Sequence, residues 1–376
     1  DLREGATRFR LPAGPHLAAS DEGVPGLAEL GVLLRASDEL VAGGVTDDDA
    51  FAALVAAGSS IGGAQPKAAV RGWGEAPAIA KFTRPALGTE PHWDVVGWER
   101  VTQLLARRCG LDTVPSGLVR AGGTRADGTA AGGSAAGRGK EGGGEGAGGG
   151  NVFVIERFDR CAGRRIGFAT AFTMLGAIER DDAHSYLEIV EVLRAHSPRP
   201  QRDLEELFRR VVFSILVANT DEHLRNHGFL RRGGGWALSP LYDVNPNPRS
   251  EGLLMTAVDE ADHSASIELA ASSAESYGLS ARRGCEVIGE VEAGTRPWRE
   301  VAASLCLRPE EVELMAAAFE SPERGVAARL AGLAGRAAGG PGGRGATGNR
   351  SSRAMALDTG SATALGGASD AGSATA

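Results

Sequence analysis

The stretch DLEELFRRVVFSILVANTDEHLRNHGFL, residues 203–230, joins the longest amphipathic run of the chain to a polar segment. Apolar residues recur every three or four positions from Asp203 to Asn219, which predicts a helix with one buried face. The polar segment that follows contains Asp221 and Asn226. By itself this pair fits a helix end followed by a turn, where Asp and Asn are common because their side chains bond to nearby backbone.

A second acidic motif adds weight to the pair. Asp243 follows in LSPLYDVNP, 17 residues after Asn226. Asp-x-x-x-x-Asn is the spacing of a protein-kinase catalytic loop, in which the Asp accepts the substrate hydroxyl proton and the Asn oxygen binds Mg²⁺. A downstream Asp would complete the metal site, because Mg²⁺ prefers hard oxygen ligands. We therefore expect Asp221, Asn226 and Asp243 to be the catalytic residues, with Asn226 and Asp243 holding the metal.

Lysines mark a second region. Residues 59–82 predict a loop, strand, turn and strand, that is, a hairpin opened by a glycine loop. Only three of the 40 basic residues are lysines, and two of them, Lys67 and Lys81, lie in this hairpin. A strand Lys that reaches the α/β-phosphates and is held by a helix Glu is typical of kinase nucleotide lobes. Glu99, in a helix predicted over 93–109, is placed to be that partner; the alternative is a snorkelling strand Lys.

Two further motifs are weaker. GGAQPK at 62–67 lacks the spacing of a Walker A loop and of GxGxxG, yet its glycines are able to present backbone N–H groups to phosphate. ERFDR at 156–160 joins the β-rich part of the chain to the α-rich part. A hinge that presents backbone groups to adenine would lie there.

Composition separates a folding part from two glycine-rich segments. Residues 121–150 carry 14 of the 55 glycines and residues 335–376 carry 11. We interpret them as a disordered surface loop and a disordered tail. NVFVIERF at 151–158 predicts a buried strand, and helical periods dominate from Ala169 onward. The other expected helices lie at 26–57 (two short helices), 281–293, 298–305 and 309–319.

Several classes of protein are disfavoured. The net charge of −8 argues against a surface that binds duplex nucleic acid. The four cysteines show no CxxC spacing, HLRNH at 223–227 lacks the Glu of HExxH, and no GxSxG elbow occurs. No apolar run approaches the ~20 residues that span a bilayer, and the N-terminus shows no signal-peptide pattern. We expect a cytoplasmic protein in a reducing compartment.

Four motifs in order identify a family resemblance: SIGGAQPK at 60–67, IERFDR at 155–160, NTDEHLRNHGFL at 219–230 and LSPLYDVNP at 238–246. With them, the chain resembles the HipA family of bacterial serine/threonine kinases, the toxin halves of HipBA-type toxin–antitoxin pairs. Weaker matches, beginning with DLREGATRF, extend the resemblance over roughly residues 1–320. Each motif alone is weak, whereas the set is specific.

The resemblance implies an α+β, protein-kinase-like two-lobe fold of HipA type, with ATP and Mg²⁺ bound between the lobes. We expect a β-containing N-terminal lobe over 1–160, an α-helical catalytic lobe over 161–332 and a tail over 333–376. Ser60 matches the serine that the family autophosphorylates in its own glycine loop. That modification adds about two negative charges to a loop that cradles phosphates and switches the kinase off.

Residue by residue, Asp221 matches the family's catalytic Asp, Asn226 and Asp243 its metal ligands and Lys81 its phosphate-contacting lysine. His223 is expected to shape the catalytic loop through hydrogen bonds. The residues expected to contact ATP are Ser60, Ile61, Gly62, Gly63, Ala64, Gln65, Lys67, Lys81, Glu99, Glu156, Arg157, Phe158 and His223.

Family members phosphorylate a protein, in the best-known case glutamyl-tRNA synthetase, which stalls translation. The resemblance therefore implies an aminoacyl-tRNA synthetase or another protein as acceptor. It also implies a HipB-like helix-turn-helix antitoxin as partner, DNA contacted only through that antitoxin, and no membrane. The subdomain that precedes the DLREGATRF-like segment in the family is not among the 376 residues. Two alternatives stay open: an ATP-binding pseudokinase that acts as a regulator, and a kinase of a small-molecule acceptor.

Overall fold

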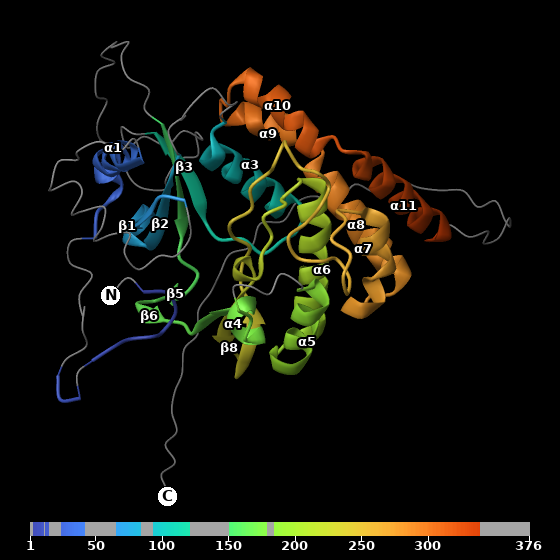
Figure 1. The fold of residues 1–376 in the computed structure, drawn as a ribbon, viewed down its shortest axis with the longest axis horizontal. Coiled ribbons are helices and arrows are strands. Elements are labelled where there is room, and N and C mark those ends of the chain that lie inside the picture. The colour runs from blue at the N-terminus through green and yellow to red at the C-terminus, as the bar shows by residue number, and fades with distance from the viewer. Residues whose placement is uncertain are drawn as a thin grey trace, which may run out of the picture. The chain divides into compact units, whose positions relative to one another are not determined.

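A four-stranded antiparallel sheet organises the N-terminal part of the chain (Figure 1). The computed structural model describes residues 3–10, 12–14, 24–41, 65–83, 93–120, 150–178 and 184–338. The strands, in the spatial order β1-β2-β4-β3, are β1 (Lys67–Arg71), β2 (Pro77–Phe82), β3 (Ser116–Arg120) and β4 (Asn151–Glu156). The hairpin predicted within 59–82 and the strand predicted over 151–158 are confirmed as β1–β2 and β4.

The sheet is buried on both faces, because its apolar residues alternate between two helices. Val152 and Val154 of β4 pack toward α1 (Leu30–Val41), which follows the 3-10 turn η1 (Leu27–Glu29). Phe153 and Ile155 of the same strand pack with Val96 of α3 (Val95–Arg108). Together, β1–β4 and α1 form what we call the sheet lobe.

Helix α3 is also part of the largest hydrophobic core. Trp98 is fully buried there, with ring centroids 6.2 Å from Trp298 and 6.0 Å from Phe319. Thr102 Oγ1 donates to Val244 O at 2.6 Å, and Gln103 Nε2 donates to Leu241 O at 3.3 Å. These contacts fasten α3 to the second half of the chain.

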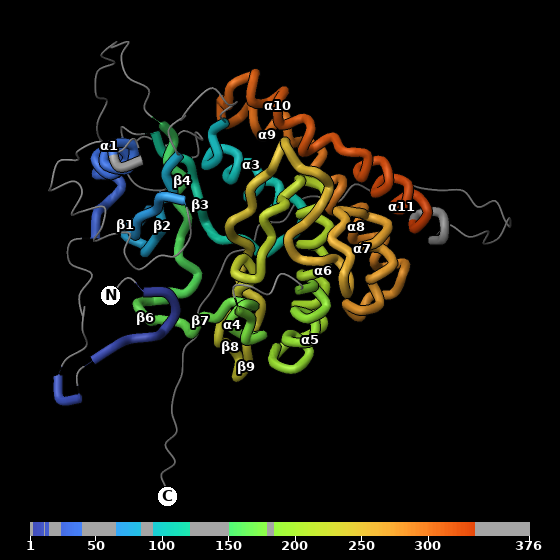
Figure 2. Tube along the Cα trace, viewed as in Figure 1, coloured from blue at the N-terminus to red at the C-terminus, as the bar shows by residue number. Residues whose placement is uncertain are grey.

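The second half is mostly helical, and we call the region from β7 to α11 the helical lobe (Figure 2). A small hairpin of β5 (Arg160–Cys161) and β6 (Arg164–Arg165) precedes the helical lobe. In the sheet lobe, the connection between β1 and β2 contains the 3-10 turn η2 (Trp73–Glu75). The helices are α4 (Ala171–Leu175), α5 (Tyr186–His196), α6 (Pro200–Leu216), α7 (Ile267–Ser272), α8 (Ala281–Thr295), α9 (Trp298–Ser304), α10 (Pro309–Phe319) and α11 (Pro322–Ala338), with 3-10 turns η3 (Leu224–Asn226) and η4 (Ala274–Tyr277). The predicted helices at 93–109, 203–219, 281–293, 298–305 and 309–319 are confirmed as α3, α6, α8, α9 and α10.

Two features of the helical lobe differ from the prediction. A three-stranded sheet of β7 (Phe168–Thr170), β8 (Gly228–Arg232) and β9 (Gly235–Leu238) interrupts the helices. Helix α11 extends to Ala338, so residues 333–338 belong to a helix and not to the predicted tail. Its Ala- and Gly-rich sequence is close in composition to the tail, which concealed it. The predicted helical residues 42–57, the insert 121–149 and residues 339–376 lie outside the described residues.

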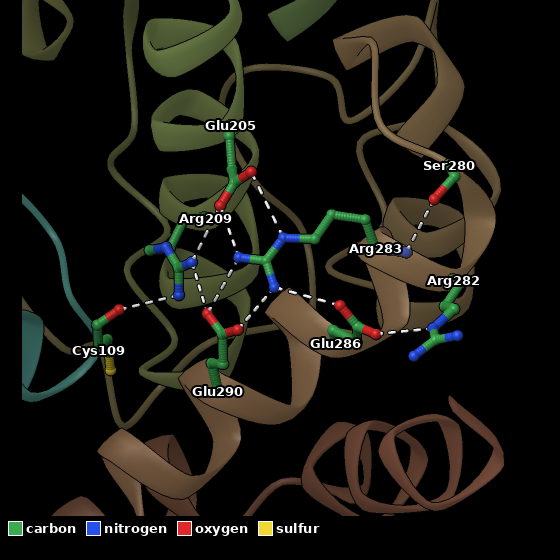
Figure 3. Close-up of polar contacts among 8 residues, drawn as sticks. All are labelled: Cys109, Glu205, Arg209, Ser280, Arg282, Arg283, Glu286 and Glu290. Atoms are coloured by element: carbon green, nitrogen blue, oxygen red, sulfur yellow. Dashed lines mark hydrogen bonds and ion pairs between the residues drawn. The ribbon is translucent and has the colours of Figure 1, made fainter. Parts of the chain in front are cut away.

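A network of four charged side chains links α6 to α8, and we call it the α6–α8 network (Figure 3). Arg283 Nη2 lies 2.6 Å from Glu205 Oε1 and its Nη1 lies 2.7 Å from Glu290 Oε1. Arg209 Nη2 lies 2.6 Å from Glu290 Oε2 and 3.4 Å from Glu205 Oε1, and its Nη1 donates to Cys109 O. Glu286 also lies 3.4 Å from Arg283 Nη1, but it pairs with Arg282 at 2.9 Å, so cations and carboxylates balance one another across the cluster.

Two sequence-level exclusions can be compared with the structure. Among the described residues, no helix is both long enough and apolar enough to cross a membrane. The four cysteines, at positions 109, 161, 285 and 306, are all free thiols.

Candidate active site

A cavity of about 840 Å³ opens between the sheet lobe and the helical lobe. This volume lies within the range of small-molecule and cofactor sites. The residues that line it are Glu4, Gln65, Lys67, Ile79, Lys81, Val95, Ile155, Glu156, Arg157, Phe158, Asp159, Phe168, Ala169, Thr170, Phe172, Thr173, Asp221, His223, Arg225, Asn226, Tyr242, Asp243 and Asn245. Nearly all of the described residues predicted to form the site are among them.

One part of the lining is apolar and aromatic. Ile79 of β2 and Ile155 of β4 contribute aliphatic side chains. The Phe158 ring lies 5.6 Å from the Phe168 ring and 5.4 Å from the Tyr242 ring, centroid to centroid. Aliphatic and aromatic surfaces of this kind suit a flat heteroaromatic group such as a purine.

Within the described residues, backbone hydrogen bonding at the end of β4 leaves one acceptor without a partner. The N–H of Glu156 donates to Pro115 O and the N–H of Arg157 donates to Pro77 O, each at 2.9 Å. In an antiparallel pair the Pro115 N–H would bond back to the Glu156 carbonyl, but proline has no N–H. The Glu156 carbonyl at the cavity wall is therefore left to accept a hydrogen bond from a ligand. The Arg157 guanidinium, by contrast, is held by both carboxylate oxygens of Asp159.

Three charged side chains meet at the polar part of the cavity, and we call them the cleft triad: Lys81, Glu99 and Asp243. Lys81 Nζ lies 2.7 Å from Glu99 Oε1 and 2.6 Å from Asp243 Oδ1. The Glu99 side chain is fully buried, whereas that of Asp243 is one-third exposed. The predicted pairing of the strand lysine with the helix glutamate is thus present in the structure.

The cleft triad fixes the charge states of Lys81 and Asp243. Burial alone would favour a neutral amine, but the two carboxylates raise the pKa of Lys81, which stays protonated. The Lys81 ammonium lowers the pKa of Asp243 to about 2, against the effect of burial. Burial raises the pKa of Glu99, and Lys81 opposes that rise. At neutral pH the Asp243 carboxylate is ionised and faces the cavity.

A second lysine extends the positive charge. Lys67 is in register with Lys81 across the β1–β2 pair, so the two side chains lie on the same face of the sheet. Burial and the neighbouring Lys81 ammonium lower the pKa of Lys67. Gln65 also lines the cavity and donates from Nε2 to Phe82 O. The predicted ATP-contacting residues from Ser60 to Ala64 lie outside the described residues.

The residues predicted to form the catalytic loop follow directly after α6. Asn226, at the end of η3, is buried and donates from Nδ2 to Asp221 O at 2.9 Å. The Asp221 side chain is exposed to the cavity and to solvent. Partial burial and the charges of Asp243 and Glu222 raise the pKa of Asp221, although His223 opposes them. A carboxylate with a raised pKa is a better proton acceptor than an ordinary surface Asp.

Oxygen ligands for a divalent ion are present at this position. The Asn226 amide nitrogen is engaged by Asp221 O, which leaves the amide oxygen for other contacts. Asp243 Oδ1 accepts from Lys81, which leaves Oδ2. Among the described residues, no group of three or more His, Cys, Asp or Glu side chains is arranged to hold a metal. The two oxygens nevertheless fit Mg²⁺, which in nucleotide sites is bound by one or two protein side chains, phosphates and water.

Sequence reasoning missed a buried network beneath the catalytic loop. The carboxylate of Glu222 accepts from Asn219 Nδ2 at 2.8 Å and from Tyr186 OH at 3.1 Å, and lies 2.9 Å from His227 Nε2. Asn219 Oδ1 in turn accepts from the backbone of Asn245 at 3.1 Å. No periodicity marks Glu222, and only its position beside Asp221 could have drawn attention to it. The network joins the catalytic loop to the segment that carries Asp243.

The side chains at positions 223 and 227 have separate surroundings. His223 lines the cavity, and its backbone oxygen accepts from the N–H of Asn226 at 2.8 Å. Its buried Nδ1 has no hydrogen-bond partner among the described residues, so the loop-shaping contact comes from the backbone and not from the predicted ring. His227 is buried against the edge of the Tyr186 ring.

The N-terminal segment contributes a lining residue that no motif indicated. Glu4 lies in the cavity wall, and burial raises its pKa. The neighbouring Gly5 N–H donates to Asp159 Oδ2 at 2.7 Å, while Arg160 and Arg165 donate to the Gly5 carbonyl. The DLREGATRF match therefore has a structural basis at the cavity.

Two solved structures resemble the chain at low sequence identity. A Shewanella oneidensis structure of the toxin–antitoxin system HipA and HipB with operator DNA matches with a TM-score of 0.49 and 18% identity, over 74% of this chain and 64% of that one. The Helicobacter pylori proinflammatory kinase CtkA matches with a TM-score of 0.49 and 12% identity, over 73% of this chain and 94% of that one.

Sequence comparison is more decisive. A Haemophilus influenzae protein named "Putative kinase" is 29% identical over 110 residues, which is 26% of this chain and 32% of that protein. The chain thus spans about a third of the length of this curated relative. The model of the HipA-like C-terminal domain matches residues 59–298, which is more than half of the 376 residues and includes β1–β9 and α3–α8. The chain therefore belongs to the HipA-like C-terminal domain family.

Proposed function

We propose that this chain is an ATP- and Mg²⁺-dependent serine/threonine protein kinase of HipA type. The observation that carries the proposal is the cleft triad: a buried Lys81, held by Glu99 and Asp243, in the wall of a cavity that Asp221 also lines. Phosphoryl transfer depends on positioning and on charge neutralisation, and these groups supply both.

Each group has a role in this proposal. Lys67 and Lys81 bind phosphate oxygens, and the apolar slot with the free Glu156 carbonyl holds the purine. Asn226 and Asp243 would hold Mg²⁺, which supplies neutralisation of the charge on the β- and γ-phosphates when it is bound. Asp221 orients the acceptor hydroxyl and accepts its proton as the new O–P bond forms. The buried network around Glu222 holds Asp221 in place.

The acceptors and partners extend this proposal. We propose Ser60 as a site of autophosphorylation, since the added charge would displace the glycine loop from bound phosphates. An aminoacyl-tRNA synthetase is the class of protein acceptor that family membership suggests. The same membership suggests a HipB-like helix-turn-helix antitoxin as partner and contact with operator DNA only through that partner.

Intact-mass spectrometry after incubation with Mg-ATP tests the proposal. The wild type should gain one phosphate, and the Asp221→Asn and Ser60→Ala variants should gain none. Both variants should bind ATP within about threefold of the wild type, because neither change removes the lysines or the purine slot. Nucleotide binding by a wild-type chain that transfers phosphate to neither itself nor a protein or small hydroxylated acceptor would support the pseudokinase alternative.

A further inference from the structure

Two apolar side chains are exposed beside the catalytic loop without a folding reason. Leu253 and Met255 are 53% and 55% exposed, whereas the alternate residues Leu254 and Thr256 are each 2% exposed. Both belong to the connection between β9 and α7, which is drawn in yellow to orange in Figure 2. The alternation in burial places Leu253 and Met255 on the outer side of one segment. Apolar area left in water forgoes about 25 cal/mol per Å², so such a pair contributes little to folding.

This segment is tied to the residues on both sides of Asp221. The N–H of Met255 donates to Thr220 O at 3.1 Å. The hydroxyl of Thr256 donates to Glu222 O. The segment that carries Leu253 and Met255 therefore runs alongside the two residues that flank Asp221 in sequence.

The rest of the connection holds the segment in one conformation. The N–H of Leu254 donates to His263 O, and the N–H of Ala265 donates to Gly252 O, each at 2.8 Å. On the other side, the N–H of Ala257 donates to His184 O at 2.9 Å. The exposed pair is thus preorganised, which lowers the entropic cost of binding a partner on it.

We propose that Leu253 and Met255 form a docking ledge for the acceptor segment of a protein substrate. An apolar side chain within a few residues of the acceptor Ser or Thr rests on the ledge while the hydroxyl reaches Asp221. The inference rests on the proposed kinase function and names its acceptor class. In the reaction the hydroxyl oxygen bonds to the γ-phosphorus, the bond to the bridging oxygen breaks, ADP leaves and the hydroxyl proton goes to Asp221.

The kind of molecule that would bind the ledge follows from the position of the ledge, which adjoins the residues that flank Asp221. A small acceptor such as a sugar would reach Asp221 without covering two apolar side chains on the adjoining segment. A polypeptide in an extended conformation spans about 3.3 Å per residue and would cover both. The other large apolar side chains that are exposed in the described ranges, at positions 9, 32, 178 and 333, belong to other segments.

A degenerate peptide library tests the ledge. The library consists of nine-residue peptides with a central Ser, in which each flanking position in turn is fixed as Leu, Lys, Asp or Gly. The enzymes are the full-length wild type, Leu253→Asp, Met255→Asp and the control Leu333→Asp, which changes an equally exposed leucine on α11. Transfer from Mg-ATP, peptide-independent ATP hydrolysis and the melting temperature are measured for each.

The wild type should select Leu at one or more flanking positions. Leu253→Asp and Met255→Asp should each lower kcat/KM for the selected peptide by about 10-fold or more, mainly through KM, as expected for the loss of one apolar contact. ATP hydrolysis and melting temperature should stay at the wild-type level, and Leu333→Asp should behave as the wild type.

Three other outcomes would overturn the ledge. Peptide phosphorylation with no apolar selection, or with equal rates in all four enzymes, would remove the docking role and leave the kinase function standing. Transfer to a small hydroxylated compound such as kanamycin, but to no peptide, would assign the other acceptor class. A wild type with no transfer here and none in the intact-mass experiment would reject the proposed function and the ledge together.

Discussion

The cleft triad and the α6–α8 network are both ionic clusters that join distant parts of the chain, yet they differ in burial and in charge balance. The triad sets one buried cation against two carboxylates. The network sets two arginines against two glutamates, and all of these side chains except that of the buried Arg209 are partly exposed. Its closest atom pairs are as short as those of the triad, so geometry alone does not distinguish the two clusters.

The difference teaches how to separate a functional cluster from a structural one. A buried cluster with surplus charge is costly to fold, since desolvation of each ion is only partly offset by its partners. Such a cluster is explained when a ligand completes it, as phosphates and Mg²⁺ would in the cleft. A balanced, partly exposed cluster needs no ligand and contributes modestly to stability.

The largest expected effect is that of removing the cation from the triad. Lys81→Met should lower phosphoryl transfer by roughly 10²–10³-fold, the usual cost of losing a preorganised electrostatic contact. The fold should survive, because burial already favours protonation of Glu99 and its carboxyl group takes up a proton when Lys81 is gone. Single-turnover transfer and the melting temperature check this expectation. Lys81→Arg, which keeps the charge, is the matched control, and a Met variant with wild-type transfer would contradict the role.

The next effect, smaller than that of Lys81→Met, should distinguish the candidate active site from the α6–α8 network by its dependence on pH. Proton acceptance needs ionised Asp221, whose pKa lies above its ordinary value of 3.8, so transfer should fall as pH decreases through that raised pKa. Asp243, with a pKa of about 2, stays ionised throughout this range. The measurement is the pH profile of kcat from about pH 8 to pH 5, repeated with Glu99→Gln, because burial raises the pKa of Glu99 to about 7 and this group also titrates in the range.

Over the same pH range, the stability that the α6–α8 network contributes should stay constant. Hydrogen bonds from Arg283 lower the pKa of Glu205, and the arginines lower that of Glu290 against the effect of burial. Because these pKa values are lowered on folding, their stabilisation is fully present above the ordinary value of 4.5 and is lost only as pH falls through the lowered values. The melting temperature should therefore stay level while kcat declines. If kcat and the melting temperature fall together as the pH decreases, the loss of activity at low pH reports unfolding and not protonation at the candidate active site.

The smallest effect is expected from the network itself. Arg283→Ala should lower the free energy of unfolding by about 1 kcal/mol or less, because the side chain is about one-third exposed and screened by water. The loss should shrink further in about 0.5 M salt, where screening is stronger. Denaturant titration at two salt concentrations measures it. Phosphoryl transfer by the variant should stay within about twofold of the wild type, and a larger drop would make the network part of the functional machinery.

The parts of the fold that could be predicted are those with one strong local pattern. The apolar period of α6 and the Val- and Ala-rich strands around Lys81 are legible because each element buries a regular face. The strands β8 and β9 were missed, since their charged and glycine residues resemble a loop and only pairing with each other and β7 makes them a sheet.

The residues of the candidate site also separate into those that the sequence predicts and those that only the structure reveals. Asp221, Asn226 and Asp243 could be named because their chemistry needs fixed residue types at a recognisable spacing. Glu222 and Glu4 could not, since each acts through contacts with residues far away in sequence. The unused Glu156 carbonyl depends on a proline in another strand, which no reading of the hinge motif alone reveals.

The attachment of α3 to the helical lobe has a mechanical consequence. Trp98, Thr102 and Gln103 fasten this helix to the same half of the molecule that carries Asp243. The same helix also packs against the sheet, since Val96 shares a core with Phe153 and Ile155. Glu99 therefore lies on the one element of the triad that contacts both lobes. The distances from the Lys81 ammonium to Glu99 and to Asp243 then report separately on movement of the sheet against α3 and against the helical lobe.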